Sequence, residues 1–218
     1  MKRVYIVVEG QTEQEFVNSV ISPYLQNFGI LNVTPILIRT SRTGRGGMVS
    51  YSHLANTIKP LLMSEKNDYI VTTFIDFFRL PHDMPHYGDS MKKSDKIEQI
   101  KSLEEAINVA IGDRRFFSYI QLHEFEALLF SSNKGFEYYF PEELAEKTAS
   151  IISSYDNPED INTSPKGAPS KRLLAIKSDY NKVLEGNLIA LEIGIKSILE
   201  KCPRFAEWIN NIVEKCKE

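Results

Sequence analysis

The sequence predicts an α/β protein with a parallel four-stranded sheet flanked by helices and a C-terminal helical appendage. Short apolar runs read as strands at residues 3–8, 33–39, 69–75 and 115–122. Segments of helical periodicity separate these runs, and parallel strands require such crossover connections. No further strand pattern occurs after about residue 131. We therefore expect an α/β domain over residues 1–130 and a helical region over residues 131–218 packed on it.

The first strand and its exit begin the chain. Residues 3–8 (RVYIVV) show no polar alternation, which is typical of a strand buried on both faces. Gly10 follows closely and permits a tight turn and the close approach of a ligand. Thr12 and Glu15 have the spacing of a capping box, so a helix is expected to begin there, and Pro23 is expected to kink or end it.

The later elements follow the same alternation. Residues 69–75 (YIVTTFI) give the clearest strand pattern. Asp95 and Glu98 have capping-box spacing before a long amphipathic helix that leads to the fourth strand. In the last third of the chain, helical periodicity predicts helices at residues 141–154, 169–180, 187–201 and 203–216.

Composition limits the classes of function. Hydrophobic residues make up 42% of the 218 and charged residues 25%, with a net charge of −3, as in an ordinary soluble protein. Because the chain is not basic overall, any contact with phosphate must be local. No apolar run is long enough for a signal peptide or a membrane span. Cys202 and Cys216 form no disulfide framework, so a reduced, cytoplasmic protein is expected.

Acidic residues follow three of the four predicted strands. Glu9 ends the first strand, Asp76 ends the third, and His123, Glu124 and Glu126 follow the fourth. Ligands of open parallel sheets bind beyond the carboxyl ends of the strands, so these side chains are expected to meet there. One acid after a strand is usually a turn residue, but converging carboxylates repel each other unless a cation neutralises them. Oxygen ligands of this kind suit Mg²⁺ or Mn²⁺ and metal-assisted phosphodiester chemistry.

Two basic clusters are candidate phosphate sites. Arg42 and Arg45 lie in a glycine-rich loop after the second strand, and the alternative is a solvated loop that happens to be basic. Lys171 and Arg172 fall in the first turn of a predicted helix, where the helix dipole disfavours cations. Their position is explained if an anion binds at that helix end, although a surface helix with tolerated charges is equally compatible with the sequence.

At these residues the sequence resembles a known family. The blocks "VEGQTEQEFV", "FIDFFRLP", "HEFEALLF" and "APSKRL" are similar to those of the bacterial domain-of-unknown-function 4276 family, a Toprim-like group. The resemblance implies a Toprim-type sheet, a functional glutamate at Glu9 and divalent-metal ligands that include Asp76. Phe78 departs from the Asp-x-Asp pattern of Toprim domains. Glu124 or Glu126 would then supply the second acid, with Asp83 a lesser candidate.

The leading hypothesis is a Mg²⁺- or Mn²⁺-dependent nuclease of Toprim type. Asp76 with Glu124 or Glu126 would hold the metal, and Glu9 would act as general acid or base or as a further ligand. His123 would orient a water or move a proton. The alternative is a catalytically weak or inactive module that binds nucleotides or nucleic acid. The resemblance also implies a bacterial phage-defence or mobile-element role beside an ATPase partner.

Overall fold

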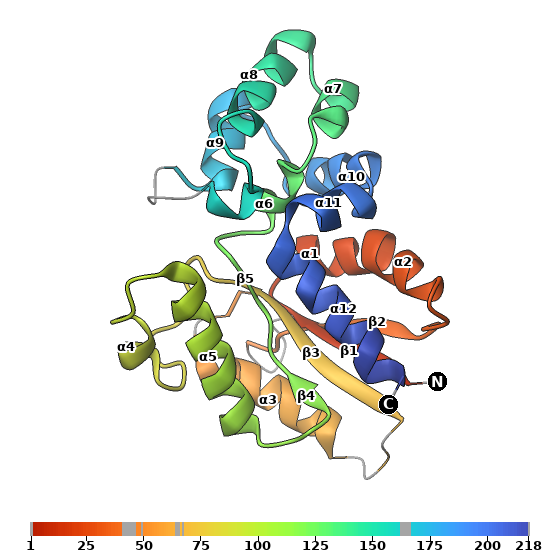
Figure 1. The fold of residues 1–218 in the computed structure, drawn as a ribbon, viewed down its shortest axis with the longest axis vertical. Coiled ribbons are helices and arrows are strands. Elements are labelled where there is room, and N and C mark those ends of the chain that lie inside the picture. The colour runs from red at the N-terminus through yellow and green to blue at the C-terminus, as the bar shows by residue number, and fades with distance from the viewer. Residues whose placement is uncertain are drawn as a thin grey trace.

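The computed structural model describes residues 2–40, 47–48, 50–63, 66, 68–161 and 167–217. A parallel sheet runs through it in the order β2-β1-β3-β4, with β5 also paired to β3 (Figure 1). The strands are β1 (Arg3–Val8), β2 (Val33–Leu37), β3 (Tyr69–Asp76), β4 (Phe116–Phe117) and β5 (Ile120–Gln121). The predicted fold class, a parallel sheet flanked by helices with a helical carboxyl-terminal part, is confirmed.

The predicted fourth strand is split into β4 and β5. Between them, the hydroxyl of Thr73 donates to the carbonyl of Tyr119 at 2.8 Å and accepts from its N–H at 2.7 Å. The main-chain N–H and carbonyl of Tyr119 are therefore bonded to a side chain of β3 and not to the backbone of β3. A buried threonine thus interrupts the ladder without leaving polar groups unpaired.

Both faces of the central strand β1 are buried, as its continuous apolar run predicts. Val4, Ile6 and Val8 belong to one core cluster, and Val7 belongs to the other. The first cluster is covered by the helices that follow β1 and by the last helix, and the second by the helices after β2 and β3 (Figure 1). These covering helices are α1 (Gln11–Phe16), α2 (Ser22–Gln26), α3 (Tyr51–Leu62), α5 (Lys96–Ile111) and α12 (Pro203–Lys217).

The first helix begins earlier than predicted and is not regular. Its N-cap is Gly10, so Thr12 lies buried inside α1, and the expected capping box of Thr12 and Glu15 is not formed. A π-helical turn at Val17–Ile21 separates α1 from α2, in which Pro23 occupies the first turn. The capping prediction for α5 is confirmed, because the Asp95 carboxylate accepts a hydrogen bond from the N–H of Glu98 at 2.9 Å.

The last third of the chain is helical. Helices α7, α8 and α9 lie farthest from the sheet, α10 and α11 lie between them and the sheet, and α12 returns along the strands so that the two ends of the chain meet (Figure 1). The side chain of Lys2 donates to the carbonyl of Lys215 at 3.0 Å. The remaining helices are α4 (Tyr87–Ser90), α6 (Glu126–Leu129), α7 (Lys134–Tyr139), α8 (Glu142–Ile152), a 3₁₀ turn (Pro158–Asp160), α9 (Pro169–Ile176), α10 (Leu184–Ile193) and α11 (Ile195–Lys201).

The helical part shares a core with the sheet. One cluster of buried residues includes Ile6 of β1, Phe136 of α7, Ile189 of α10 and Trp208 of α12. Phe74 of β3 stacks on Trp208 with ring centroids 5.4 Å apart. The division of the chain at residue 130 stays a prediction. None of the helices in the described ranges is both long and apolar enough to cross a lipid bilayer.

Candidate functional site

Two of the predicted acids meet at the carboxyl edge of the sheet. Glu9 directly follows β1 and Asp76 is the last residue of β3, and these strands are neighbours in register from Arg3 opposite Tyr69 to Val8 opposite Phe74. The side chain of Asp76 accepts a hydrogen bond from the N–H of Phe125 at 3.1 Å. This contact ties the end of β3 to the segment that follows β5.

Glu13 is a third acid in the cluster, and no sequence pattern predicted its place there. Because Gly10 is the N-cap of α1, Glu13 lies one helical turn after Glu9, and it is only 3% exposed. A Cβ atom at Gly10 would lie 2.9 Å from the Oε2 atom of Glu13. The backbone of Gly10 is extended, so a glycine is needed here for space and not for an unusual φ angle.

Lys182 brings the acids together and was also not predicted. Its Nζ lies 3.2 Å from Glu126 Oε2, 3.5 Å from Glu13 Oε1 and 3.8 Å from Asp76 Oδ2. The preceding residue holds it in place, because Asn181 Oδ1 accepts from the N–H of Leu184 at 3.0 Å at the start of α10. The helical part of the chain therefore contributes a cation to the edge of the sheet.

Of the two acids predicted after the fourth strand, Glu126 is the one that joins this cluster. It is the first residue of α6 and is 0% exposed. Neither of its carboxylate oxygens has a hydrogen-bond partner among the described residues, but the carboxylate forms an ion pair with Lys182. The hydroxyl of Tyr180 is also buried and has no hydrogen-bond partner in the same part of the chain.

Glu124 and His123 occupy different places. The carboxylate of Glu124 accepts from the N–H and the hydroxyl of Ser170, at 3.1 and 3.0 Å, at the start of α9. His123 is buried, has a positive φ of 70°, and uses its carbonyl to accept from the N–H of Phe78 at 2.9 Å. Burial, with the charge of Lys96, lowers the pKa of His123 to about 4, so its imidazole is neutral at pH 7. Their predicted catalytic and metal roles stay predictions.

The predicted phosphate-binding residues lie outside the cluster or outside the described residues. Lys171 is exposed on α9. Arg172 is engaged, because it donates to the carbonyl of Gly167 at 2.8 Å and to the hydroxyl of Tyr155 at 3.0 Å. Arg42 and Arg45 fall outside the ranges that the structure describes. Asp83, the lesser metal candidate, accepts from the N–H of Tyr51 at the start of α3.

The cluster holds more negative than positive charge. Burial and the nearby Glu13 raise the pKa of Glu9 to about 7, against the opposing effects of Lys182 and of two backbone N–H groups. Burial also raises the pKa of Asp76 well above its usual range, with Lys182 opposing this and Glu13 among the acids that add to it. Burial raises the pKa of Glu126 as well. Four carboxylates around one ammonium group thus favour protons or a further cation.

The donor set suits a hard divalent cation by its chemistry. All four acids offer oxygen atoms, and both oxygens of Glu126 lack hydrogen bonds from described residues. In the described ranges, however, no three acids, histidines or cysteines are grouped closely enough to form a ready-made metal site. Lys182 stands among three of the acids. A metal held by Glu9, Glu13, Asp76 and Glu126 would therefore require Lys182 to move.

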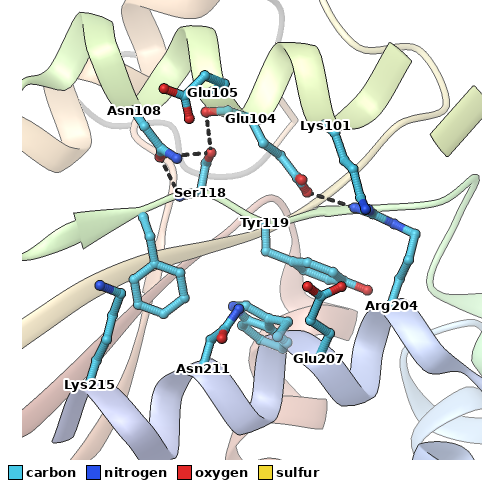
Figure 2. Close-up of a pocket in the computed structure, with 12 residues that line it drawn as sticks. Lys101, Glu104, Glu105, Asn108, Ser118, Tyr119, Arg204, Glu207, Asn211 and Lys215 are labelled. Atoms are coloured by element: carbon cyan, nitrogen blue, oxygen red, sulfur yellow. Dashed lines mark hydrogen bonds and ion pairs between the residues drawn. The ribbon is translucent and has the colours of Figure 1, made fainter. Parts of the chain in front are cut away.

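A pocket elsewhere in the fold has a structural explanation. A pocket of about 440 Å³ lies between α5 and α12 at the β4 edge of the sheet (Figure 2). The N–H of Ser118 donates to Asn108 at 2.7 Å, and Glu104 accepts from the N–H of Ile120 at 2.8 Å. Side chains of α5 thus satisfy donors of the edge strand and protect it from pairing with other chains. None of the predicted site residues lines this pocket.

The fold and the cluster define a class of protein: an α/β protein with a carboxylate–lysine cluster at the carboxyl edge of a parallel sheet. The chain belongs to the family described as "Domain of unknown function (DUF4276)", whose model matches residues 8–213. No curated protein matches the sequence significantly.

Two of the similar solved structures are C-terminal regions of OLD proteins. The C-terminal region of the OLD protein of Xanthomonas campestris pv. campestris aligns over 99% of this chain and 95% of its own, with 15% identity and a TM-score of 0.46. The C-terminal region of the Burkholderia pseudomallei OLD protein aligns over 99% of this chain and 97% of its own, with 17% identity and a TM-score of 0.48.

Proposed function

We propose that this protein is a divalent-metal-dependent phosphodiesterase, a nuclease of Toprim type that acts on nucleic acid. One observation carries the proposal: Glu9, Glu13, Asp76 and Glu126 lie at one edge of the sheet around Lys182. Bound there, Mg²⁺ or Mn²⁺ would polarise a phosphate oxygen and lower the pKa of a water nucleophile. Glu13, Asp76 and Glu126 would hold the ion once Lys182 had moved aside, which leaves Glu9 for proton transfer.

The residues of the chain have separate tasks in this proposal. With a pKa of about 7, Glu9 can accept or give up a proton at neutral pH, as a general acid or base must. Lys182 remains charged at neutral pH: burial opposes its charge, but Asp76, Glu126 and Glu13 raise its pKa. Freed from the carboxylates by a metal ion, its ammonium group would be available to a phosphate of the substrate.

A second function is favoured by the same contacts. Lys182 already occupies the middle of three carboxylates, and Phe78 stands where a Toprim domain has its second aspartate. A site neutralised by its own lysine could bind nucleotides or nucleic acid without cutting. In either case, the family resemblance supports a role in a bacterial defence or mobile-element system with an ATPase partner.

Incubation with nucleic acid separates these functions. Pure protein is mixed with single- and double-stranded DNA and RNA in the presence of Mg²⁺, Mn²⁺ or a chelator. We expect cleavage with metal only, lost at least 100-fold in Glu9→Gln, Asp76→Asn and Lys182→Met, because each removes a charge from the reacting centre. Lys134→Met is the matched control, since Lys134 pairs with Glu192 on the surface of α7. Metal-independent binding without cleavage would reject the nuclease and support the binding module.

Binding of the metal has its own readout. Titration calorimetry with Mn²⁺ should show one class of site in the wild-type protein, and Asp76→Asn should weaken it at least tenfold while the Lys134→Met variant binds normally. No heat of binding in the wild-type protein, with folding intact by circular dichroism, would contradict the metal site.

A further inference from the structure

Phe78 is a large apolar side chain that the core does not use. It lies two residues after Asp76 and is half-buried, and neither of the two core clusters of the described residues includes it. Its neighbour Phe77, by contrast, packs against the second cluster. An aromatic ring normally gains its stability from burial, so a ring left half in water beside a polar site calls for another contact.

Arg79 accompanies this ring in a strained conformation. Its guanidinium carbon lies 5.3 Å from the centroid of the Phe78 ring, a cation–π distance. The φ angle of Arg79 is 62°, a left-handed conformation that costs energy for residues other than glycine. Arg79 is exposed, and it takes part in none of the ion pairs found in the described ranges. Its charge is therefore available to a ligand.

Hydrogen bonds fix this pair next to the carboxylate cluster. The N–H of Phe78 donates to the carbonyl of His123 at 2.9 Å, and the N–H of Leu80 donates to the carbonyl of Phe77 at 3.2 Å. His123 has a positive φ as well, and Asp76 is bonded to Phe125 in the same segment. Two strained backbone positions thus meet where two loops are bonded together, as is common at binding sites. The ring is presented on a rigid support.

We propose that Phe78 and Arg79 form a stacking platform for an unpaired nucleobase, with the guanidinium contacting an adjacent phosphate. The inference rests on the proposed function and specifies its substrate class: single-stranded nucleic acid, or a duplex with an unpaired end. A base within a duplex has both faces covered by its neighbours, whereas an unpaired base can stack on an aromatic ring. Arginine binds phosphate and stacks on aromatic rings, so one residue can serve both contacts.

Fluorescence anisotropy in the presence of a chelator tests the platform without cleavage. The probes are a labelled 12-nucleotide single strand of DNA, the same sequence as RNA, its blunt duplex, and a DNA strand with abasic positions. We expect the single strands to bind at least tenfold more tightly than the duplex and the abasic strand. Phe78→Leu should weaken binding of the single strands roughly tenfold, and Phe78→Trp should retain it.

Two controls separate stacking from general effects. Phe28→Leu changes a 47% exposed phenylalanine that lies just beyond α2, before the amino end of β2 and thus at the opposite edge of the sheet from Phe78. This variant should bind like wild type. Arg79→Gly relieves the positive φ, so it should not lower the thermal unfolding midpoint, yet it should weaken binding at least fivefold. If Arg79 were only structural, Arg79→Gly would bind as wild type does, and that result would overturn its part in the platform.

The outcomes also separate this inference from the proposed function. Equal affinity for duplex and single strand, unchanged by Phe78→Leu, would overturn the platform even if metal-dependent cleavage is observed. Binding of single strands that depends on Phe78, without cleavage in any metal, would support the platform while rejecting the nuclease.

Discussion

Gly10 leaves the carboxylate of Glu13 the space that a side chain would take. A methyl group at Gly10 would lie 2.9 Å from Oε2 of Glu13, which is the mobile end of a side chain and can move aside. Gly10→Ala should therefore leave the fold intact and displace one acid of the cluster. We expect Mn²⁺ affinity to fall roughly tenfold or more, with little change in thermal stability, as measured by calorimetry and by thermal unfolding.

Gly88 provides the control for this substitution. A Cβ atom at Gly88 in α4 would have no heavy atom within 4 Å. Gly88→Ala should bind Mn²⁺ like wild type. If Gly10→Ala also binds normally, Glu13 does not contribute to the metal site.

At the scale of single residues, the sequence predicts a site residue where its place is marked by the neighbouring strand. Glu9 and Asp76 each stand at the end of an apolar run, so a parallel sheet had to bring them to one edge. Lys182 has no such marker, because it lies in a connection between α9 and α10 and reaches the acids through the folding of the helical part. Contacts between residues far apart in the chain are set by packing, which one sequence does not display.

At the scale of elements, Glu124 caps a helix to which it does not belong. The N-cap of α9 is Ala168, which has no side-chain acceptor, and Glu124 instead accepts from the N–H and hydroxyl of Ser170. A buried carboxylate at a helix N-terminus is stabilised by the free N–H groups and by the helix dipole. The arrangement joins the "HEFEALLF" and "APSKRL" blocks directly.

This contact predicts a loss of stability in Glu124→Gln. We expect the free energy of unfolding in urea to fall by roughly 1–2 kcal/mol, because a charged acceptor is replaced by a neutral one. Ser170→Ala should cost about 1 kcal/mol, and the double variant should cost less than the sum, since the two residues share one interaction. If Glu124→Gln instead lowers Mn²⁺ affinity and leaves stability unchanged, the sequence prediction of a metal ligand holds and the cap is secondary.

The first helix shows why element boundaries are harder to predict than elements. Thr12 and Glu15 have capping-box spacing, but Thr12 is buried and the N-cap lies two residues earlier, at Gly10. That shift turns Glu13 toward the sheet edge and leaves Glu15 exposed. A local pattern therefore identified the helix, while packing of its inner face decided where it starts.

At the scale of the whole molecule, Arg204 connects three parts of the fold. Its guanidinium donates to Glu104 of α5 at 2.8 Å, shown as a dashed line in Figure 2, and to the carbonyl of Ile120 at 3.3 Å. Its backbone N–H donates at 3.1 Å to Glu159, which lies in the 3₁₀ turn of the helical part. Glu159 is 0% exposed and thus caps the start of α12 from a distance. These bonds stabilise the docking of the helical part, while Arg204 Nε and Glu159 Oε1 are buried without a hydrogen-bond partner in the described ranges.

Glu159 makes this junction sensitive to pH. Burial raises its pKa to about 7, although the backbone N–H groups of Arg204 and Phe205 and the charge of Arg204 oppose the shift and Asp160 adds to it. Between about pH 4.5 and pH 7 the folded protein therefore binds a proton at Glu159 that the unfolded chain has released. The contribution of this group to stability is fully present below pH 4.5 and is lost as the pH rises through 7. The buried Oε1 of Glu159, which has no hydrogen-bond partner in the described ranges, fits a protonated carboxyl.

Glu159→Gln removes that titration and should change the pH profile of stability. Relative to wild type, the variant should gain up to roughly 3 kcal/mol in unfolding free energy between pH 5 and pH 8, because wild type alone must bury a charge above pH 7. Urea unfolding at several pH values, with the wild-type curve subtracted, isolates this residue from the other buried acids. Asp160→Asn, at an exposed neighbouring position, should show a much smaller change over the same range. Parallel curves for wild type and Glu159→Gln would mean that Glu159 is ionised in the folded protein, so that the contacts of Arg204 outweigh the cost of burying its charge.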